Sequence, residues 1–320
     1  MSALAGATVL VAGGYGFVAA GLVEELLGRG ASVVALGRDP AKARERFGAG
    51  ERRNFRFVAA DASEPGAYAG PVDYLVHAAS AASPVRYAKD PVGVLSPNVF
   101  GTRALLDLAK ERGAKGFLFL SSAEVYGSVP EARQPIKETE AGAVDPLASR
   151  SCYAESKRMG ETLCAAYERQ HGLPAVIARL FHTYGPGMAL DDGRVFADFV
   201  ADAVAKRAVT IKGDGLDRRS FCFLSDAVDG LLTLLTEGTP GEAYNLANET
   251  AELSVRELAD LMARLFPGRV KGVVRAVPSE GYVPSPVRRC LPDVSKLRAL
   301  GWSPKVGPEE GFRRTVESYL

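Results

Sequence analysis

A glycine-rich turn near the start of the chain constrains the fold more than any other segment. Residues 13–19, GGYGFVA, follow the short apolar run Thr8–Ala12 and open a stretch with helical periodicity. In the spacing G-x-x-G-x-x-A, Gly13 permits a tight turn, Gly16 lets the backbone approach a diphosphate, and Ala19 lets helix and strand pack closely. The free N–H groups of the helix start then face the anion. The turn therefore predicts a dinucleotide site whose contacts are Gly13, Gly16, Phe17 and Val18.

Short apolar runs alternate with helical stretches through the first half of the chain. We predict strands at residues 8–12, 32–36, 55–59, 74–77, 116–120 and 175–180, and helices at 18–29, 40–47, 92–112 and 153–171. Continuous apolar strands separated by helices are typical of a parallel sheet covered on both faces. Right-handed crossovers make such a sheet doubly wound. The fold class is therefore α/β, a Rossmann-like doubly wound parallel sheet, and we expect the last of these strands to close it.

The regular alternation of predicted strands and helices ends after residue 180. Turn clusters at residues 185–187 and 191–193 precede further predicted elements: a helix near 195–206, a strand at 209–211 and a helix near 225–237. No linker composition separates the two halves. We therefore expect a dinucleotide-binding Rossmann domain over residues 1–180. A smaller mixed α/β lid that binds a nucleotide sugar, over residues 181–320, is expected to be interleaved with it.

Composition argues against several classes of function. The chain has 320 residues, with 39 Lys and Arg against 38 Asp and Glu, so charge gives no case for binding nucleic acid or a membrane surface. Its four cysteines are widely spaced, which argues against a disulfide framework or a metal site and for a reducing, cytoplasmic compartment. The almost uncharged run 3–23 could pass for a signal peptide, but it lacks a basic start and glycines interrupt it.

The end of the second predicted strand bears on the choice of cofactor. NAD sites usually place an acid there to hold the adenosine ribose, whereas this chain has Gly37 followed by Arg38. An acid would repel a 2′-phosphate, and an arginine can pair with it. We therefore predict NADP, with NAD as the alternative; otherwise Arg38 is a solvated cation. Asp61, after the third strand, is either a partner of the adenine edge or a helix cap.

A tyrosine and a lysine four residues apart indicate the chemistry. Tyr153 and Lys157 fall on one face of a predicted helix. A lysine cation near a phenol favours phenolate, so that the tyrosine can move protons near neutral pH. Ser122 follows the strand 116–120, and its hydroxyl would hold the same substrate oxygen. Combined with the glycine turn, this pattern is a strong signal for hydride chemistry on a hydroxyl or ketone.

These segments resemble the extended short-chain dehydrogenase/reductase family, in its NAD(P)-dependent nucleotide-sugar epimerase/dehydratase branch, over essentially the whole chain. The similar segments are residues 13–19, 77–80, 98–102, 121–127, 153–157, 179–186 and 217–226. The resemblance implies a catalytic triad of Ser122, Tyr153 and Lys157, with Lys157 also binding the nicotinamide ribose. It implies further cofactor contacts at Ala78 and Ala79. It implies substrate contacts at Ser80, Glu124, His182, Arg194, Arg219 and Arg289.

The resemblance leaves the reaction open. Ala123 stands where 4,6-dehydratases carry a proton-donating acid, which argues against dehydration because alanine cannot donate a proton. Glu124 looks like the glutamate of glucuronate decarboxylases. However, His182 replaces their asparagine near the substrate phosphates, and residues 285–286 replace expected acids. The segment around His182 is also similar to reductases of nucleotide-linked 4-keto-6-deoxyhexoses.

Because net reduction uses NADPH, we predict an NADP(H)-dependent oxidoreductase of deoxysugar biosynthesis. It would act at C4 of a nucleotide-diphosphate sugar and reduce a 4-keto-6-deoxyhexose. The alternatives are a C4-epimerase or a UDP-glucuronate decarboxylase-like enzyme with tightly bound NAD. A non-catalytic dinucleotide sensor is disfavoured by the complete triad. The resemblance also implies a homodimer, in which the helices that hold residues 98–112 and 153–171 form a four-helix bundle.

Overall fold

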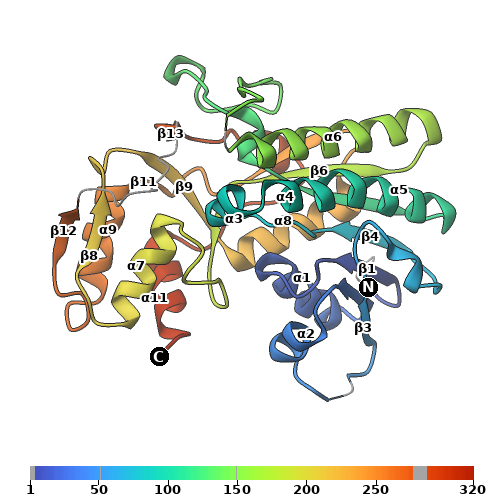
Figure 1. Ribbon diagram of the computed structural model, residues 1–320, viewed down its shortest axis with the longest axis horizontal. Coiled ribbons are helices and arrows are strands. Elements are labelled where there is room, and N and C mark those ends of the chain that lie inside the picture. The colour runs from blue at the N-terminus through green and yellow to red at the C-terminus, as the bar shows by residue number, and fades with distance from the viewer. Residues whose placement is uncertain (1–3, 51, 149, 277–286) are drawn as a thin grey trace.

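The computed structural model describes residues 4–50, 52–148, 150–276 and 287–320. Within those ranges its centre is a parallel sheet of seven strands, in the order β10-β6-β5-β4-β1-β2-β3 (Figure 1). The strands are β1 (Thr8–Ala12), β2 (Ser32–Gly37), β3 (Phe55–Ala59), β4 (Tyr74–His77), β5 (Gly116–Ser122), β6 (Ala175–Leu180) and β10 (Ala243–Leu246). The prediction of a Rossmann-like doubly wound sheet is therefore confirmed.

Helices cover both faces of this sheet, and others belong to the second half of the chain. The helices of the described residues are α1 (Phe17–Gly28), α2 (Pro40–Phe47), α3 (Pro84–Lys89), α4 (Pro91–Ser96), α5 (Thr102–Glu111), α6 (Ser151–His171), α7 (Val195–Val204), α8 (Leu224–Glu237), α9 (Val255–Leu265), α10 (Ser295–Arg298) and α11 (Pro308–Glu317). Alternate residues of a strand point to opposite faces. Along β1, Val9 and Val11 accordingly pack with α1 and α8, while Leu10 and Ala12 pack in the core that contains α5 and α6.

The sheet extends one strand further than we expected. β6 does not close it, because β10 pairs with β6 in parallel, with Ala243 opposite Ile177. β10 has only four residues and follows a turn, so its sequence gives a weak strand signal. Buried Asn245 holds it in place: its amide donates to the carbonyl oxygens of Ile136 (2.8 Å) and Asp293 (2.9 Å) and accepts from the Tyr126 hydroxyl (2.6 Å).

The helix predicted over residues 92–112 is interrupted. α4 and α5 are joined by a π-helical turn over Pro97–Gly101. Within this turn the buried Asn98 donates to the carbonyl oxygen of Val94 (3.1 Å) and to the hydroxyl of Ser156 on α6 (3.0 Å). π-helical turns often occur at functional sites because they redirect one side chain. Here the turn ties α4 and α5 to the helix that carries Tyr153.

The second half of the chain builds a lid beside the carboxyl ends of the main strands. Its larger sheet contains β7 (His182–Tyr184), β9 (Arg218–Phe223), β11 (Glu252–Ser254) and β13 (Arg289–Cys290), and its smaller one pairs β8 (Val209–Lys212) with β12 (Val273–Ala276). Aromatic side chains from β9, α7 and α11 fill a separate core. β10 and α8 lie past residue 180 but pack on the main sheet. We keep the division into residues 1–180 and 181–320 as a proposal.

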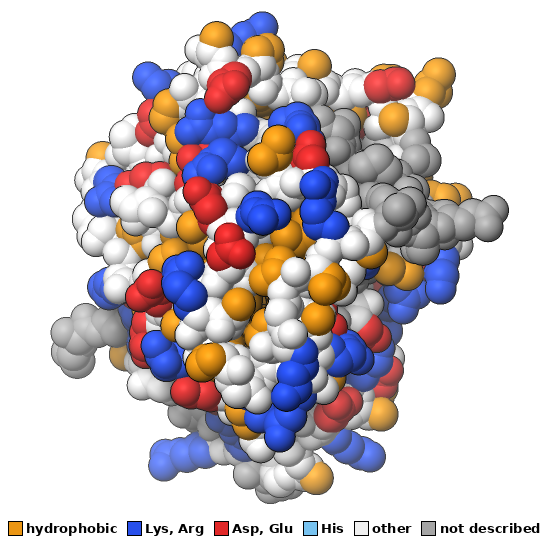
Figure 2. Space-filling view, turned by 90° about the vertical axis from the view of Figure 1, so that its left-hand side faces the viewer, with side chains coloured by type: hydrophobic (Ala, Val, Ile, Leu, Met, Phe, Trp, Pro, Cys, Tyr) orange, Lys and Arg blue, Asp and Glu red, His pale blue; other side chains and the backbone are white. Residues whose placement is uncertain are grey.

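The surface of the lid mixes charges of both signs. On the face shown in Figure 2, basic and acidic side chains are interspersed around exposed apolar ones. None of the helices in the described ranges has the length and apolar character that a membrane span requires. Nor do three or more His, Cys, Asp or Glu side chains come together there as metal ligands.

The fold yields a stability prediction at Asn245. Asn245→Ala removes three buried hydrogen bonds and leaves their partners unsatisfied, so we expect the free energy of unfolding to fall by about 3 kcal/mol. Urea denaturation measures this. The control is Thr236→Ala, since that hydroxyl bonds a carbonyl of its own helix (3.2 Å). A loss at Asn245 no larger than that of the control would show that β10 is held by other contacts.

Candidate active site

The glycine turn forms a cradle for a diphosphate. Gly13 has φ +78°, and a Cβ on it would lie 2.6 Å from the Cα of Ala79, so the turn needs glycine there. Gly16 precedes the first residue of α1; no side chain caps this helix, and its first turn holds no acid. The N–H groups at the helix start are therefore left for a ligand, and an anion there meets a positive dipole end. These residues fit the diphosphate of a dinucleotide.

A cavity of about 1220 Å³ runs from this turn to the lid. It is larger than a typical site for one small molecule, so it has room for two ligands. Many residues singled out from the sequence line it: Gly16, Phe17, Val18, Ala78, Ser80, Ser122, Glu124, Tyr153, Lys157, His182, Arg194 and Arg219. Others lie outside the lining: Gly13, Arg38, Asp61, Ala79 and Arg289. Of these, Gly13 and Ala79 meet directly behind the turn.

The predicted triad comes together at the carboxyl end of β5. Ser122 ends this strand, and its hydroxyl oxygen accepts from the backbone N–H of Glu124 (3.2 Å). Tyr153 and Lys157 extend from α6 into the same region of the cavity, and the Lys157 Nζ lies 5.8 Å from the centre of the Tyr153 ring. That Nζ donates to the carbonyl oxygen of Leu120 (2.6 Å). A sugar hydroxyl in the cavity can thus meet Ser122 and Tyr153 together.

Burial dominates the ionisation of the triad. It raises the pKa of Tyr153 to about 12, while a hydrogen bond with Ser122 and, more weakly, the charge of Arg194 oppose the rise. It also lowers the pKa of Lys157 to about 7, against the opposing charge of Glu161. Lys157 is not among the groups that shift the pKa of Tyr153 in this arrangement, so the lowering of that pKa by Lys157 stays a prediction.

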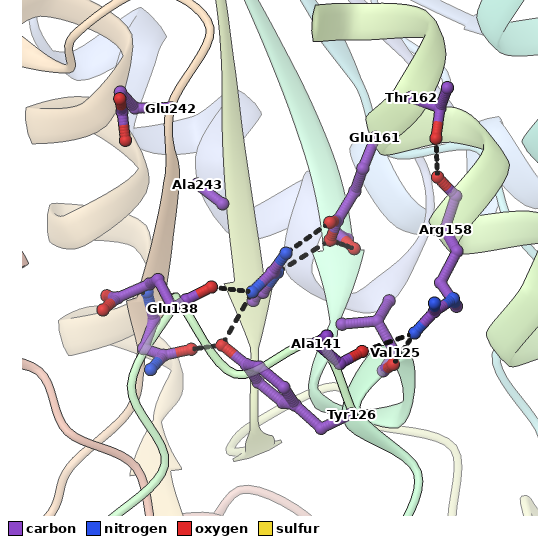
Figure 3. A network of polar contacts seen from close by, with 12 residues as sticks. Val125, Tyr126, Glu138, Ala141, Arg158, Glu161, Thr162, Glu242 and Ala243 are labelled. Atoms are coloured by element: carbon purple, nitrogen blue, oxygen red, sulfur yellow. Dashed lines mark hydrogen bonds and ion pairs between the residues drawn. The ribbon is translucent and has the colours of Figure 1, made fainter. Parts of the chain in front are cut away.

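A part-buried network of polar contacts centres on Glu161 (Figure 3). Arg179 of β6 binds both carboxylate oxygens of Glu161 on α6, at 2.9 and 2.6 Å. Glu161 also accepts from the hydroxyl of Ser121, the neighbour of Ser122 (2.5 Å). Arg179 donates further to the Tyr126 hydroxyl (2.9 Å), which in turn donates to Asn245. The network thus links β5, β6, β10 and α6 directly under the catalytic residues.

Arg219 and Arg194 put positive charge on the lid side of the cavity. Arg219 is buried, and its guanidinium donates to the carbonyl oxygens of Arg218 (2.8 Å) and Val287 (2.6 Å). Arg194 pairs with Asp192 and lies over the Phe196 ring, at 4.9 Å from its centre. Both arginines are held in place before any substrate binds.

Arg289 lies elsewhere than the resemblance implied. Its guanidinium faces away from the cavity and pairs with Glu252 (2.6 Å) and Glu131 (3.4 Å). Alternate residues of an extended segment point to opposite sides, and Arg288 and Cys290 line the cavity instead. We therefore propose Arg288, rather than Arg289, as the late arginine of the substrate site. Residues 285–286 lie outside the described residues.

Among the described residues of the cavity wall, His182 and Ser80 each have a side-chain atom without a hydrogen-bond partner, Nδ1 and Oγ respectively. The His182 ring packs edge-on against Phe196 and Phe221. Burial, with the charges of Arg219 and Arg194, lowers the pKa of His182 to about 3, so the ring is neutral. Both atoms are buried and have no hydrogen-bond partner in the structure.

Sequence reasoning missed a second aromatic residue at the site. Tyr87 of α3 is buried and stacks on Tyr153, with ring centres 4.9 Å apart and planes 17° apart. No pattern around Tyr87 marks it. Glu161 was also missed, although its place four residues after Lys157 on one helix face could have revealed it.

Comparisons with known proteins agree with this geometry. A model of the NAD dependent epimerase/dehydratase family matches residues 9–247. UDP-glucuronic acid decarboxylase 1 from Arabidopsis thaliana is 39% identical over 97% of this chain and 69% of its own. UDP-glucose 4-epimerase from Thermotoga maritima, solved with UDP-glucose, has a TM-score of 0.86 at 27% identity, covering 98% of both chains. The UDP-glucose 4-epimerase of Thermus thermophilus, solved with NAD, has a TM-score of 0.83 at 27% identity, again covering 98% of both.

The chain therefore belongs to the NAD dependent epimerase/dehydratase family, as the resemblance indicated. It is a nucleotide-sugar enzyme of the epimerase/dehydratase type.

The buried neutral histidine at the end of β4 predicts a pH dependence of stability. Burial lowers the pKa of His77 to about 3, whereas the unfolded chain takes up this proton below about 6.5. Stability from His77 is therefore complete above pH 6.5 and is lost as the pH falls towards 3. His77→Gln should make this loss shallower by about 1.4 kcal/mol per pH unit.

Urea unfolding at pH values from about 7.5 to about 4.5, on either side of the ordinary histidine pKa, measures the slope. The matched control is Asn98→Ala, a buried polar change in the neighbouring π-helical turn, which should lower stability equally at every pH. Equal slopes for the wild type and His77→Gln would contradict the prediction.

Proposed function

We propose that the chain decarboxylates UDP-glucuronate through transient oxidation at C4. The observation that carries this proposal is the position of Glu124, which lines the cavity beside Ser122 and acts on the pKa of Tyr153. It stands in a chain that is similar over nearly its whole length to UDP-glucuronic acid decarboxylases of plants and vertebrates. These relatives support the decarboxylase alternative better than our first prediction, a 4-keto reductase.

The triad would open the reaction. The glycine turn and the start of α1 would hold a nicotinamide dinucleotide, which would supply hydride transfer to and from C4. Tyr153 would take the proton of the C4 hydroxyl, Ser122 would hydrogen-bond the same oxygen, and Lys157 would bind the nicotinamide ribose. The resulting C4 ketone is β to the C6 carboxylate.

Carbon dioxide then leaves from C6, and its bonding electrons pass into a C4–C5 enolate. Ser122 and Tyr153 stabilise the negative oxygen of this enolate. A proton must then reach C5, and Glu124, which lines the cavity two residues beyond Ser122, would carry it. Reduction at C4 completes a cycle that consumes no net oxidant or reductant.

The lid would hold the UDP group. Arg219 is already oriented by carbonyl oxygens, so little side-chain freedom is lost when it pairs with a diphosphate. The neutral His182 supplies a hydrogen bond from a ring nitrogen that has no other partner. The second diphosphate, that of the cofactor, would bind at the start of α1.

A 4-keto-sugar reductase is the second candidate. The observation that favours it is that Gly37 ends β2 in place of the usual acid and Arg38 follows it. Such a site suits NADPH, which a reductase consumes in each turnover.

We also propose that the protein forms a homodimer. Val92, Phe100 and Met159 expose large apolar side chains on α4, the π-helical turn and α6, which lie side by side (Figure 1). Burying these side chains against a second copy would remove them from water.

Product analysis separates the candidate reactions. With UDP-glucuronate and added NAD or NADP, we expect carbon dioxide and a UDP-pentose in equal amounts, without net change in the absorbance of the reduced nicotinamide. UDP-glucose tests for a C4-epimerase, and a nucleotide-linked 4-keto-6-deoxyhexose with NADPH tests for a reductase. Stoichiometric NADPH loss with the keto sugar, and no carbon dioxide from UDP-glucuronate, would show that the protein is a reductase and not a decarboxylase.

The role of Tyr153 can be tested by removing its hydroxyl oxygen alone. Tyr153→Phe should lower kcat by about a hundredfold or more, because it removes the hydroxyl that exchanges the proton of the C4 oxygen. Cofactor binding should remain. Tyr167→Phe is the matched control: it lies on the same helix, but its hydroxyl binds Asp107 (2.7 Å) outside the cavity. Turnover by Tyr153→Phe within about tenfold of the wild type would remove Tyr153 from the mechanism.

A further inference from the structure

The ring of Tyr15 occupies the space where a side chain at residue 37 would begin. A Cβ built on Gly37 would lie 2.4 Å from Cε1 of Tyr15 and 2.9 Å from its Cδ1. Gly37 is not among the glycines with positive φ, so its backbone would accept any L residue. The tyrosine ring, and not the backbone, therefore restricts this position to glycine.

Packing holds the Tyr15 ring in this place. Its centre lies 6.3 Å from that of Phe57 on β3, and the ring packs on the core under α1. The turn that carries it is pressed against β2, since a Cβ on Gly14 would lie 2.7 Å from the Cβ of Ala35. The ring cannot leave Gly37 without repacking this corner of the sheet.

The carboxylates near the end of β2 already have partners. Asp39 caps α2 by accepting from the backbone N–H groups of Ala41 (3.0 Å) and Lys42 (3.2 Å). Asp61 accepts from the N–H and hydroxyl of Ser63, at 2.9 and 2.7 Å. Arg38 lies between them with a side chain that is 77% exposed, and its ion pair with Asp61 is long, at 3.7 Å. Its guanidinium can therefore turn towards a phosphate at little cost.

We propose that Tyr15 and Arg38 together select a cofactor with a 2′-phosphate. The inference rests on the proposed dinucleotide site. Dinucleotide sites that prefer NAD place a carboxylate at the end of the second strand, where it binds the ribose hydroxyls. Tyr15 excludes that carboxylate by filling its place, and Arg38 supplies the charge that pairs with the phosphate. Tyr15 is thus a specificity-determining residue, coupled to Gly37 by direct contact.

Binding of NADPH and NADH to the full chain, freed of bound nucleotide and without sugar substrate, tests the proposal. Fluorescence titration of each dinucleotide gives its Kd. We expect the wild type to bind NADPH at least about tenfold more tightly than NADH. Arg38→Ala should weaken NADPH binding by about tenfold and leave NADH binding unchanged. Lys42→Ala, which removes an exposed cation from the adjoining helix, is the control and should change neither.

A double-mutant cycle tests the coupling between Tyr15 and Gly37. Gly37→Asp alone should weaken NADPH binding without a gain for NADH, because the ring blocks the new carboxylate. The double variant Tyr15→Ala/Gly37→Asp should bind NADH about tenfold more tightly than Gly37→Asp does. Thermal unfolding of each variant shows whether it is folded.

Three results would overturn the proposal. They are a wild type that prefers NADH, full conversion by Gly37→Asp alone, and a double variant no better for NADH than the single one. Arg38→Ala changes only an exposed side chain. Its effect on the Kd of NADPH therefore tests the proposal even where a Tyr15 variant unfolds. If neither dinucleotide binds, the proposed cofactor site itself is wrong. If the decarboxylation assay fails, the proposed reaction is wrong but the binding results still stand.

Discussion

The part-buried ion pair between Glu161 and Arg179 holds the active site together. Each partner keeps only a small part of its side chain exposed, at 12% and 13%. Charges with so little contact with water are stable when their remaining hydrogen bonds are made, and here Ser121, Tyr126 and a carbonyl oxygen make them. Because Glu161 lies one turn beyond Lys157, the pair fixes α6 against β5 and β6. The distance from Tyr153 to Ser122 follows from that contact.

The two proposed diphosphate sites also depend on a few oriented donors and not on the overall charge of the protein. The chain as a whole is nearly neutral, so attraction by the whole surface cannot hold two polyanions. An uncapped helix start serves one site, and Arg219, fixed by carbonyl oxygens of the lid, serves the other. Each relies on donors oriented before the ligand arrives, which lowers the entropy lost on binding.

The parts that could be predicted from sequence are those with a local signature. The glycine turn, six strands of the main sheet and the spacing of Tyr153 and Lys157 all follow from periodicity and residue type within short windows. β10 could not be found in this way, because its four residues become a strand only by pairing with β6, and Asn245 holds them there through bonds to distant segments. The side on which Arg289 lies depends on the register of a two-residue strand. The contact between Tyr15 and Gly37 joins two elements and is visible only once they are packed.

The placement of β10 and α8 has a consequence for how this protein can be divided. Both come from the chain beyond the lid's first strand, yet they cover the edge and one face of the sheet that begins at the N-terminus. A fragment that ends at residue 180 would expose the unpaired edge of β6 and the apolar surface that α8 covers, and exposed edges invite aggregation. The part of the chain before residue 181 is therefore not an independent folding unit, and its sheet is completed only when the second half of the chain is present.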